Sequence, residues 1–216
     1  LLHEFVTTCS NLASEAGVSS SIMKMRYCSI MSRILGTRDE LFRASLQHGA
    51  VLEILDLCKS KSDPLLQMNA FELLTEFAAT TAGYNYMVEN GIMSWLLDVS
   101  RPDDSGSMDF MLIGPAAVDC LAAIFNKATA CGVLSHDSFN NEKSDGRLLT
   151  LFVQTMTANL HADQEQARIA GFNALVLFGC SSPATAQLLC STEEVVDALV
   201  GMLRSSKAEV KVAALR

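Results

Sequence analysis

Residues 49–58 have the sequence GAVLEILDLC, and residues 91–100, which lie 42 positions later, have the sequence GIMSWLLDVS. Each stretch begins with a glycine, continues with apolar residues at helical spacing and carries an aspartate at its eighth position. Apolar residues at this spacing predict an amphipathic helix. A glycine directly before such a run is typical of a left-handed residue that ends the preceding helix. Because the interval is fixed, the two stretches indicate a repeat protein rather than a bundle of unrelated helices.

A second kind of helix alternates with the first. Residues 25–35 (MRYCSIMSRIL) and residues 67–77 (QMNAFELLTEF) are also 42 positions apart, and residues 117–125 and 170–178 repeat the same theme. We call these the lead helices. We call the helices that follow Gly49 and Gly91 the ladder helices, and further copies of them occur at 147–160 and 192–203. We expect the ladder helices to be the long helices of each repeat. Short helices that end at Gly49 and Gly91 complete each repeat.

A lead helix, a short helix, a glycine and a ladder helix in about 42 residues are typical of an armadillo repeat. The sequence therefore predicts an all-α fold, a right-handed α-solenoid of armadillo/HEAT-type repeats that forms one domain over residues 1–216. We expect four repeats at 21–62, 63–109, 110–161 and 162–206. Partial repeats at 1–20 and 207–216 indicate truncated ends, through which the chain could self-associate.

Composition excludes several classes of function. The formal net charge is −8 and no basic run is present, so neither nucleic acid nor an anionic membrane surface is an expected partner. The acidic surface serves solubility or suits a basic or mixed-charge protein. Seven dispersed cysteines, such as Cys58 and Cys120 in apolar runs, indicate reduced thiols and a cytoplasmic or nuclear protein.

Motifs for chemistry are absent from the sequence. No CxxC pair, no two histidines at helical ligand spacing, no glycine-rich phosphate loop and no GxSxG elbow occur. Adjacent carboxylates such as Glu193 and Glu194 fall at the start of an expected helix, where they favour the helix dipole. We therefore expect no enzyme activity, no metal and no cofactor.

A partner is expected on the ladder helices, which we assign to the concave face of the solenoid. The spacing predicts that Glu53, Asp56 and Lys59 lie opposite Leu52 and Leu55. The predicted binding residues are Glu53, Asp56, Lys59, Trp95, Asp98, Arg101, Gln154 and Arg204. Trp95 is either a binding hot spot on this face or packs its ring against Met93 or the adjoining repeat.

Several segments resemble one family of repeat proteins. They are MRY at 25–27, HGAV at 48–51, GYNYMVENGI at 83–92, and the acidic stretch from Pro102 to Asp109 with FMLIGP after it. In their order over about residues 20–180 they resemble the 26S proteasome non-ATPase regulatory subunit 5 family. The order of the repeats and the position of the acidic stretch carry this resemblance, because each motif alone is common among armadillo repeats.

The resemblance implies an assembly chaperone of the proteasome base. Such a protein holds the C-terminal domain of one ATPase subunit, masks a surface of it, and leaves before the proteasome is complete. The resemblance supplies no catalytic residues and no cofactor. An armadillo-type cofactor of Hsp70 that promotes nucleotide exchange, or a scaffolding adaptor, remains the alternative function.

Overall fold

A computed structural model describes residues 21–47, 49–60, 63–102, 108–135 and 144–204. The chain separates into two compact units, Leu1–Met87 and Val88–Arg216, and each is described here by itself. All regular structure in the described residues is helical. The prediction of an all-α fold built from repeated helices is confirmed. The prediction of one domain over residues 1–216, with the repeat boundaries given above, stays a prediction.

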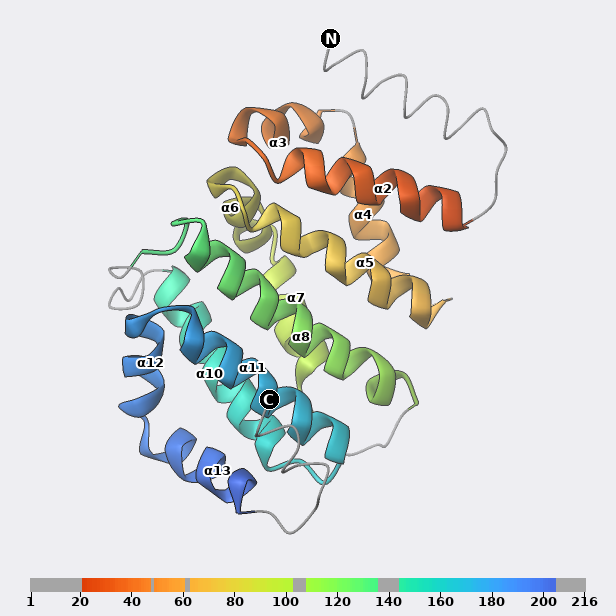
Figure 1. Cartoon of the computed structure of the whole chain (residues 1–216). Coiled ribbons are helices and arrows are strands. Elements are labelled where there is room, and N and C mark those ends of the chain that lie inside the picture. Colours follow the sequence, from red (N-terminus) through yellow and green to blue (C-terminus); the bar gives the residue numbers. More distant parts are fainter. Residues whose placement is uncertain (1–20, 48, 61–62, 103–107, 136–143, 205–216) are drawn as a thin grey trace. The chain divides into compact units, whose positions relative to one another are not determined.

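The first unit contains two lead helices, with a short helix and a ladder helix between them and a short helix after them. Lead helix α2 packs against lead helix α5, and ladder helix α4 packs against α5 as well (Figure 1). Its helices are α2 (Ser21–Leu35), α3 (Asp39–Leu46), α4 (Ala50–Lys59), α5 (Pro64–Phe77) and α6 (Thr81–Glu89), the last of which crosses the unit boundary. Asp63 caps α5 by accepting a hydrogen bond of 3.0 Å from the backbone N–H of Leu66, and Pro64 follows it.

The second unit repeats this arrangement. Its lead helices α8 and α11 lie side by side, and ladder helix α7 packs against α8 (Figure 1). Its helices are α7 (Ile92–Ser100), α8 (Met108–Ala130), α10 (Ser144–Leu160), α11 (Glu165–Ser181), α12 (Pro183–Cys190) and α13 (Glu193–Leu203). Because lead helix packs on lead helix in both units, each repeat contributes the same layer to the core.

Aromatic rings fill the core of each unit. In the first unit, the ring of Phe42 lies edge-on to that of Phe77, with centroids 5.1 Å apart. In the second unit, Phe152 stands between two neighbours, with its ring centroid 4.8 Å from Phe125 and 5.2 Å from Phe178. These three phenylalanines come from α8, α10 and α11 and are completely buried, so they join three helices at one point.

The glycines before two ladder helices have the left-handed backbone that the sequence predicts. The φ angle is +75° at Gly49 and +69° at Gly91. A Cβ atom at either position would meet no atom within 4 Å, so the strain of a substitution by alanine would come from the backbone alone. The glycine before each of these ladder helices is therefore required by its backbone conformation and not by close packing.

Helix α8 contains the one stretch among the described residues that is long and apolar enough to cross a membrane. This stretch is Met111–Ala130, with a mean hydropathy of 1.3. Of that stretch 56% is buried inside the structure, and it contains Asp119 and Lys127. Its apolar side chains are thus explained by the packing of α8 against α7 and α11.

The described cysteines fall into two classes that chemical labelling can separate. Cys28, Cys58 and Cys120 are buried, whereas Cys131, Cys180 and Cys190 are exposed. Burial, with a smaller contribution from neighbouring Cys28, raises the pKa of the Cys58 thiol. Because the thiolate is the reactive form, this thiol is inert in the folded protein.

We expect iodoacetamide at neutral pH to alkylate the three exposed cysteines within minutes and to leave the three buried ones unmodified until urea is added. Peptide mapping by mass spectrometry identifies each site. Rapid labelling of Cys58 in the native protein would contradict the packing of α2, α4 and α5.

Candidate protein-binding site

Three ladder helices are neighbours in the second unit. Helix α10 packs against α7 on one side and against α13 on the other. Each contributes an exposed stripe at helical spacing, Ser94 and Asp98 on α7 and Thr150 and Gln154 on α10 among them. Successive repeats therefore present a row of ladder helices whose exposed positions a partner can contact.

Buried amide side chains fix the ends of two ladder helices. The Nδ2 group of Asn159 on α10 donates hydrogen bonds to the carbonyl oxygen of Ser100 at 2.9 Å and of Thr155 at 3.1 Å. In the first unit, Nε2 of Gln67 donates to the carbonyl oxygen of Cys58 at 2.7 Å. Cys58 and Ser100 occupy the same position after Gly49 and Gly91. In both units, the carbonyl oxygen at this position near the end of a ladder helix thus accepts a hydrogen bond from a buried amide.

Most of the predicted binding residues are exposed. Glu53 and Trp95 are half-buried, and the exposed ones are Asp56, Lys59, Asp98, Arg101, Gln154 and Arg204. Glu53, Asp56 and Lys59 belong to the first unit and the other five to the second. The role of all eight in binding stays a prediction.

The structure brings two of these residues together. The guanidinium of Arg101 forms an ion pair with the carboxylate of Asp98 at 3.5 Å. Both side chains are more than half exposed, at 59% for Arg101 and 67% for Asp98, so the pair contributes at most about 1 kcal/mol to stability. Because it adds so little to the fold, the pair can open at little cost when a partner contacts either charge.

Two expectations about the ladder helices are wrong. Leu52 was expected on the buried side with Leu55, but its side chain is 55% exposed while Leu55 is 7% exposed. The exposed stripe of α4 is Leu52, Asp56 and Lys59, and Glu53 lies at its edge. Six residues of this ten-residue helix are buried, since α2, α3 and α5 all pack against it, and only a narrow stripe is left to solvent.

The ladder helices were also expected to be the long ones. Helices α4, α7 and α13 have 10, 9 and 11 residues, whereas the lead helices α2, α5, α8 and α11 have 15, 14, 23 and 17. Only α10, with 17 residues, has the expected length. The exposed faces of the lead helices, such as Val176 and Leu177 on α11, are therefore also available for contact.

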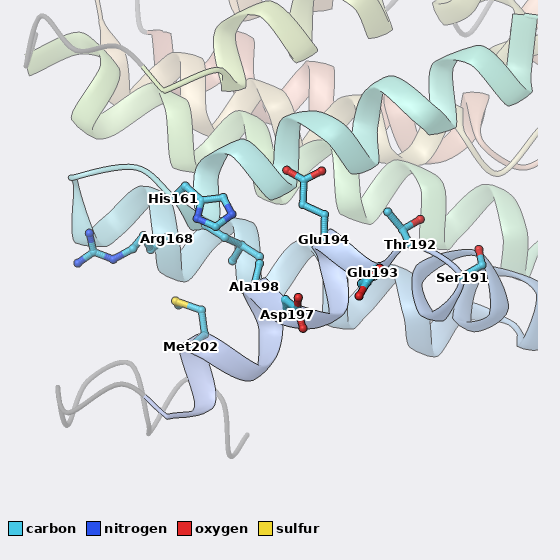
Figure 2. Close-up of a pocket in the computed structure, with 11 residues that line it drawn as sticks. His161, Arg168, Ser191, Thr192, Glu193, Glu194, Asp197, Ala198 and Met202 are labelled. Atoms are coloured by element: carbon cyan, nitrogen blue, oxygen red, sulfur yellow. The ribbon is translucent and has the colours of Figure 1, made fainter.

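An open groove of about 1190 Å³ lies between the end of α10, the start of α11 and one side of α13. Its apolar lining includes Leu160, Ala198 and Met202, each of which is at most 9% exposed. Its polar lining residues are His161, Arg168, Ser191, Thr192, Glu193, Glu194 and Asp197 (Figure 2). Sequence reasoning missed this groove, although it noticed Glu193 and Glu194.

The groove is lined by three carboxylates and one arginine. Nη1 of Arg168 donates to the carbonyl oxygen of Ala162 at 2.7 Å and to that of Asp163 at 2.8 Å. Its guanidinium points away from Glu194 and Asp197 (Figure 2). Within the described part of the chain, no ion pair involves the three groove carboxylates. Glu193 and Glu194 stabilise the start of α13, whereas Asp197 lies beyond its first turn.

No group of three or more histidine, cysteine, aspartate or glutamate side chains suited to a metal ion occurs among the described residues. The absence of enzyme activity, metal and cofactor stays a prediction. What the geometry offers is a set of exposed helix faces and one open groove, which suit contact with another macromolecule.

Comparisons with known proteins give the following. No protein-family model matches the sequence, and no curated protein matches it either. A designed armadillo repeat protein is similar in structure, with 15% sequence identity, a TM-score of 0.39, and coverage of 100% of this chain and 97% of that protein.

Proposed function

We propose that this chain is a protein-binding repeat module that acts as an assembly chaperone of the proteasome base. The observation that supports binding is the row of neighbouring ladder helices α7, α10 and α13, each with an exposed stripe. Repeats that contact only their neighbours provide extended surfaces of this kind. The more specific assignment rests on the resemblance of the segments at 25–27, 48–51, 83–92 and 102–115 to the proteasome subunit 5 family.

The proposed partner is the C-terminal domain of one proteasomal ATPase subunit, in the cytoplasm or the nucleus. The chain would cover a surface of that domain until a competing subunit displaces it, so its action is steric and needs no nucleotide. Exposed charges such as Asp98 and Arg101 would set orientation and the rate of association more than affinity.

Direct binding tests this proposal. The full-length chain is immobilised, and purified C-terminal domains of the proteasomal ATPases and the nucleotide-binding domain of Hsp70 are passed over it. We expect one ATPase domain to bind. We also expect the charge reversal Asp98→Arg to weaken that binding by about tenfold, because it removes one attraction and adds a repulsion.

The matched control is Glu89→Arg, which makes the same change in charge at an exposed position outside the ladder stripe of the second unit. It should alter affinity by less than about twofold. Binding of the Hsp70 domain in place of every ATPase domain would replace the chaperone assignment by that of an exchange cofactor. If the two variants lost affinity equally, the exposed stripe of the ladder helices would not be part of the binding site.

A further inference from the structure

Four exposed arginines lie on two adjoining helices of the first unit, since α3 packs against α2. Arg26 and Arg33 are exposed positions of α2, whereas Arg38 directly precedes α3 and Arg43 lies in the last turn of α3. Ile30 follows Arg26 by four residues and precedes Arg33 by three, so these three residues share one helix face. Its side chain is 56% exposed. We call these five residues the arginine surface.

The arginine surface contrasts in charge with the rest of the chain. Residues 21–62 contain seven lysines and arginines and four aspartates and glutamates, which gives a net charge of +3. Residues 63–216 contain nine and eighteen of them, which gives a net charge of −9. Positive charge is thus concentrated in the first repeat, where it attracts acidic groups that the remainder of the chain repels.

The charges of the four arginines are not compensated by neighbouring carboxylates. Within the described residues, none of the four forms an ion pair. Asp39 is near in sequence, but its Oδ1 accepts a hydrogen bond of 3.0 Å from the backbone N–H of Ala82. Asp39 and Glu40 both lie in the first turn of α3, where they favour the helix dipole. The guanidinium groups are therefore available to carboxylates of another molecule.

The fold does not require positive charge at these positions. The second repeat of the same unit, 42 residues later, forms the corresponding helices α5 and α6 with no basic residue in the last turn of either. Glu72 occupies the position that corresponds to Ile30. The positions that correspond to the four arginines hold Met68, Thr75, Thr80 and Asn85.

Arg38 lies at a position where a cation is unfavourable for the helix that follows. It is the N-cap residue of α3 and its side chain makes no capping hydrogen bond, although the positive end of the helix dipole is there. At the corresponding position before α6, the hydroxyl of Thr80 accepts a hydrogen bond of 3.2 Å from the backbone N–H of Gly83. Because Arg38 departs from this local rule without a gain for the helix, contact with a partner explains it better.

We propose that the arginine surface is a docking surface for an acidic segment of a partner protein, in which glutamate or aspartate alternates with apolar residues. The carboxylates of that segment pair with the guanidinium groups, whose planar geometry suits two parallel hydrogen bonds to one carboxylate. An apolar side chain of the segment contacts Ile30, which the phosphate backbone of a nucleic acid does not offer. The surface lies outside the ladder stripe, and the proposal does not depend on the chaperone function.

Fluorescence anisotropy with defined probes tests the proposal on the full-length chain. The probe is a short fluorescein-labelled peptide of alternating glutamate and leucine. Peptides that alternate leucine with serine or with lysine, and an oligothymidylate of equal charge, serve for comparison. We expect the glutamate peptide to bind about tenfold more tightly than the serine peptide and the oligothymidylate, and the lysine peptide not to bind. Tighter binding of the oligothymidylate would assign the surface to nucleic acid and overturn the proposal.

Arg33→Glu reverses one charge at the centre of the surface and should weaken the glutamate peptide by at least about fivefold. The matched control is Arg147→Glu, which makes the same change in charge at an exposed position of α10 in the second unit. It should change the affinity by less than about twofold. Equal losses in the two variants would mean that the peptide responds only to net charge, and would overturn the proposal.

Ile30→Ser tests the apolar part of the surface. It should weaken the peptide of alternating glutamate and leucine by about threefold and leave a peptide of alternating glutamate and serine unaffected. If both peptides lost affinity equally, or neither did, Ile30 would have no contact with the segment and the surface would recognise charge alone. That result would contradict the proposed alternation.

Two other occupants carry acidic residues and are tested separately. The chain's own residues 1–20 contain Glu4 and Glu15. In the full-length variant Glu4→Gln, Glu15→Gln, the affinity for the glutamate peptide should be unchanged, and a gain of fivefold or more would identify this segment as the occupant. A second copy of the chain offers its acidic residues as well. Self-association in sedimentation velocity that Arg33→Glu abolishes would identify that copy as the occupant, and either result would overturn the assignment to a partner.

Discussion

Replacing Phe152 with alanine is expected to lower the free energy of unfolding of the second unit by about 4 kcal/mol. The ring is completely buried and lies 4.8 Å from Phe125 and 5.2 Å from Phe178, centroid to centroid. Its removal takes away apolar contacts on three helices at once and leaves a cavity that the helices α8 and α11 can fill only in part. A domain has about 5–15 kcal/mol of stability in total, so this loss is a large fraction of it.

Urea denaturation followed by fluorescence measures this effect, because Trp95 is the chain's single tryptophan and belongs to the second unit. The control is Thr150→Ala, an exposed position on the same helix, which should change the midpoint little. If the two variants unfolded at the same urea concentration, Phe152 would not be the centre of this core.

Asn159→Asp is expected to destabilise the second unit by roughly 3–5 kcal/mol at neutral pH. Nδ2 donates to two carbonyl oxygens, and Asn159 is 1% exposed. The substitution would place a carboxylate oxygen where a donor is needed and would bury a charge with no partner. Even in the wild-type protein, Oδ1 of Asn159 has no hydrogen-bond partner among the described residues, so the site has no donor to offer a carboxylate.

The sign of the pH dependence follows from this environment. Burial beside carbonyl oxygens raises the pKa of the introduced carboxyl group above its value in the unfolded chain. The folded state then binds a proton more readily than the unfolded state, so the destabilisation is greatest at neutral pH and falls as the pH is lowered. Once protonated, the group can again donate one hydrogen bond.

The matched control is Asn159→Leu, which removes the donor without adding a titrating group. It should cost about 1–3 kcal/mol at every pH. Trp95 fluorescence in urea at pH 5 and pH 8 separates the two variants. A loss for Asn159→Asp that did not change between these two values would show that the site is accessible to water.

The repeat was predictable because its signals are local. Gly49 and Gly91 specify a left-handed residue directly through their missing side chains, and the structure has positive φ angles at both. The apolar periods of the lead helices likewise follow from residues three and four apart in sequence. Such local signals do not depend on how the neighbouring repeats pack.

The exposed faces were harder to predict because they depend on what packs around each helix. Glu53, Asp56 and Lys59 are three residues apart, and each step of three rotates the position by about 60° around a helix. Steps of four and three keep Leu52, Asp56 and Lys59 on one face, and that face is the exposed one. The groove is formed by the end of α10, the start of α11 and one side of α13 together, so no single stretch of sequence predicts it.

The buried amides of Gln67 and Asn159 have a consequence for how repeats find their neighbours during folding. Gln67 donates to the carbonyl oxygen of Cys58 and Asn159 to that of Ser100, which are at the same position of a ladder helix. Asn159 also donates to the carbonyl oxygen of Thr155 in its own helix. Apolar surfaces alone would tolerate a slip of one helical turn, because leucine and alanine pack in many alignments. A slipped arrangement would leave a buried amide and a helix end without partners, at a cost of about 1–3 kcal/mol for each group. These two side chains thus disfavour misaligned stacking, as a single buried asparagine does in a coiled coil.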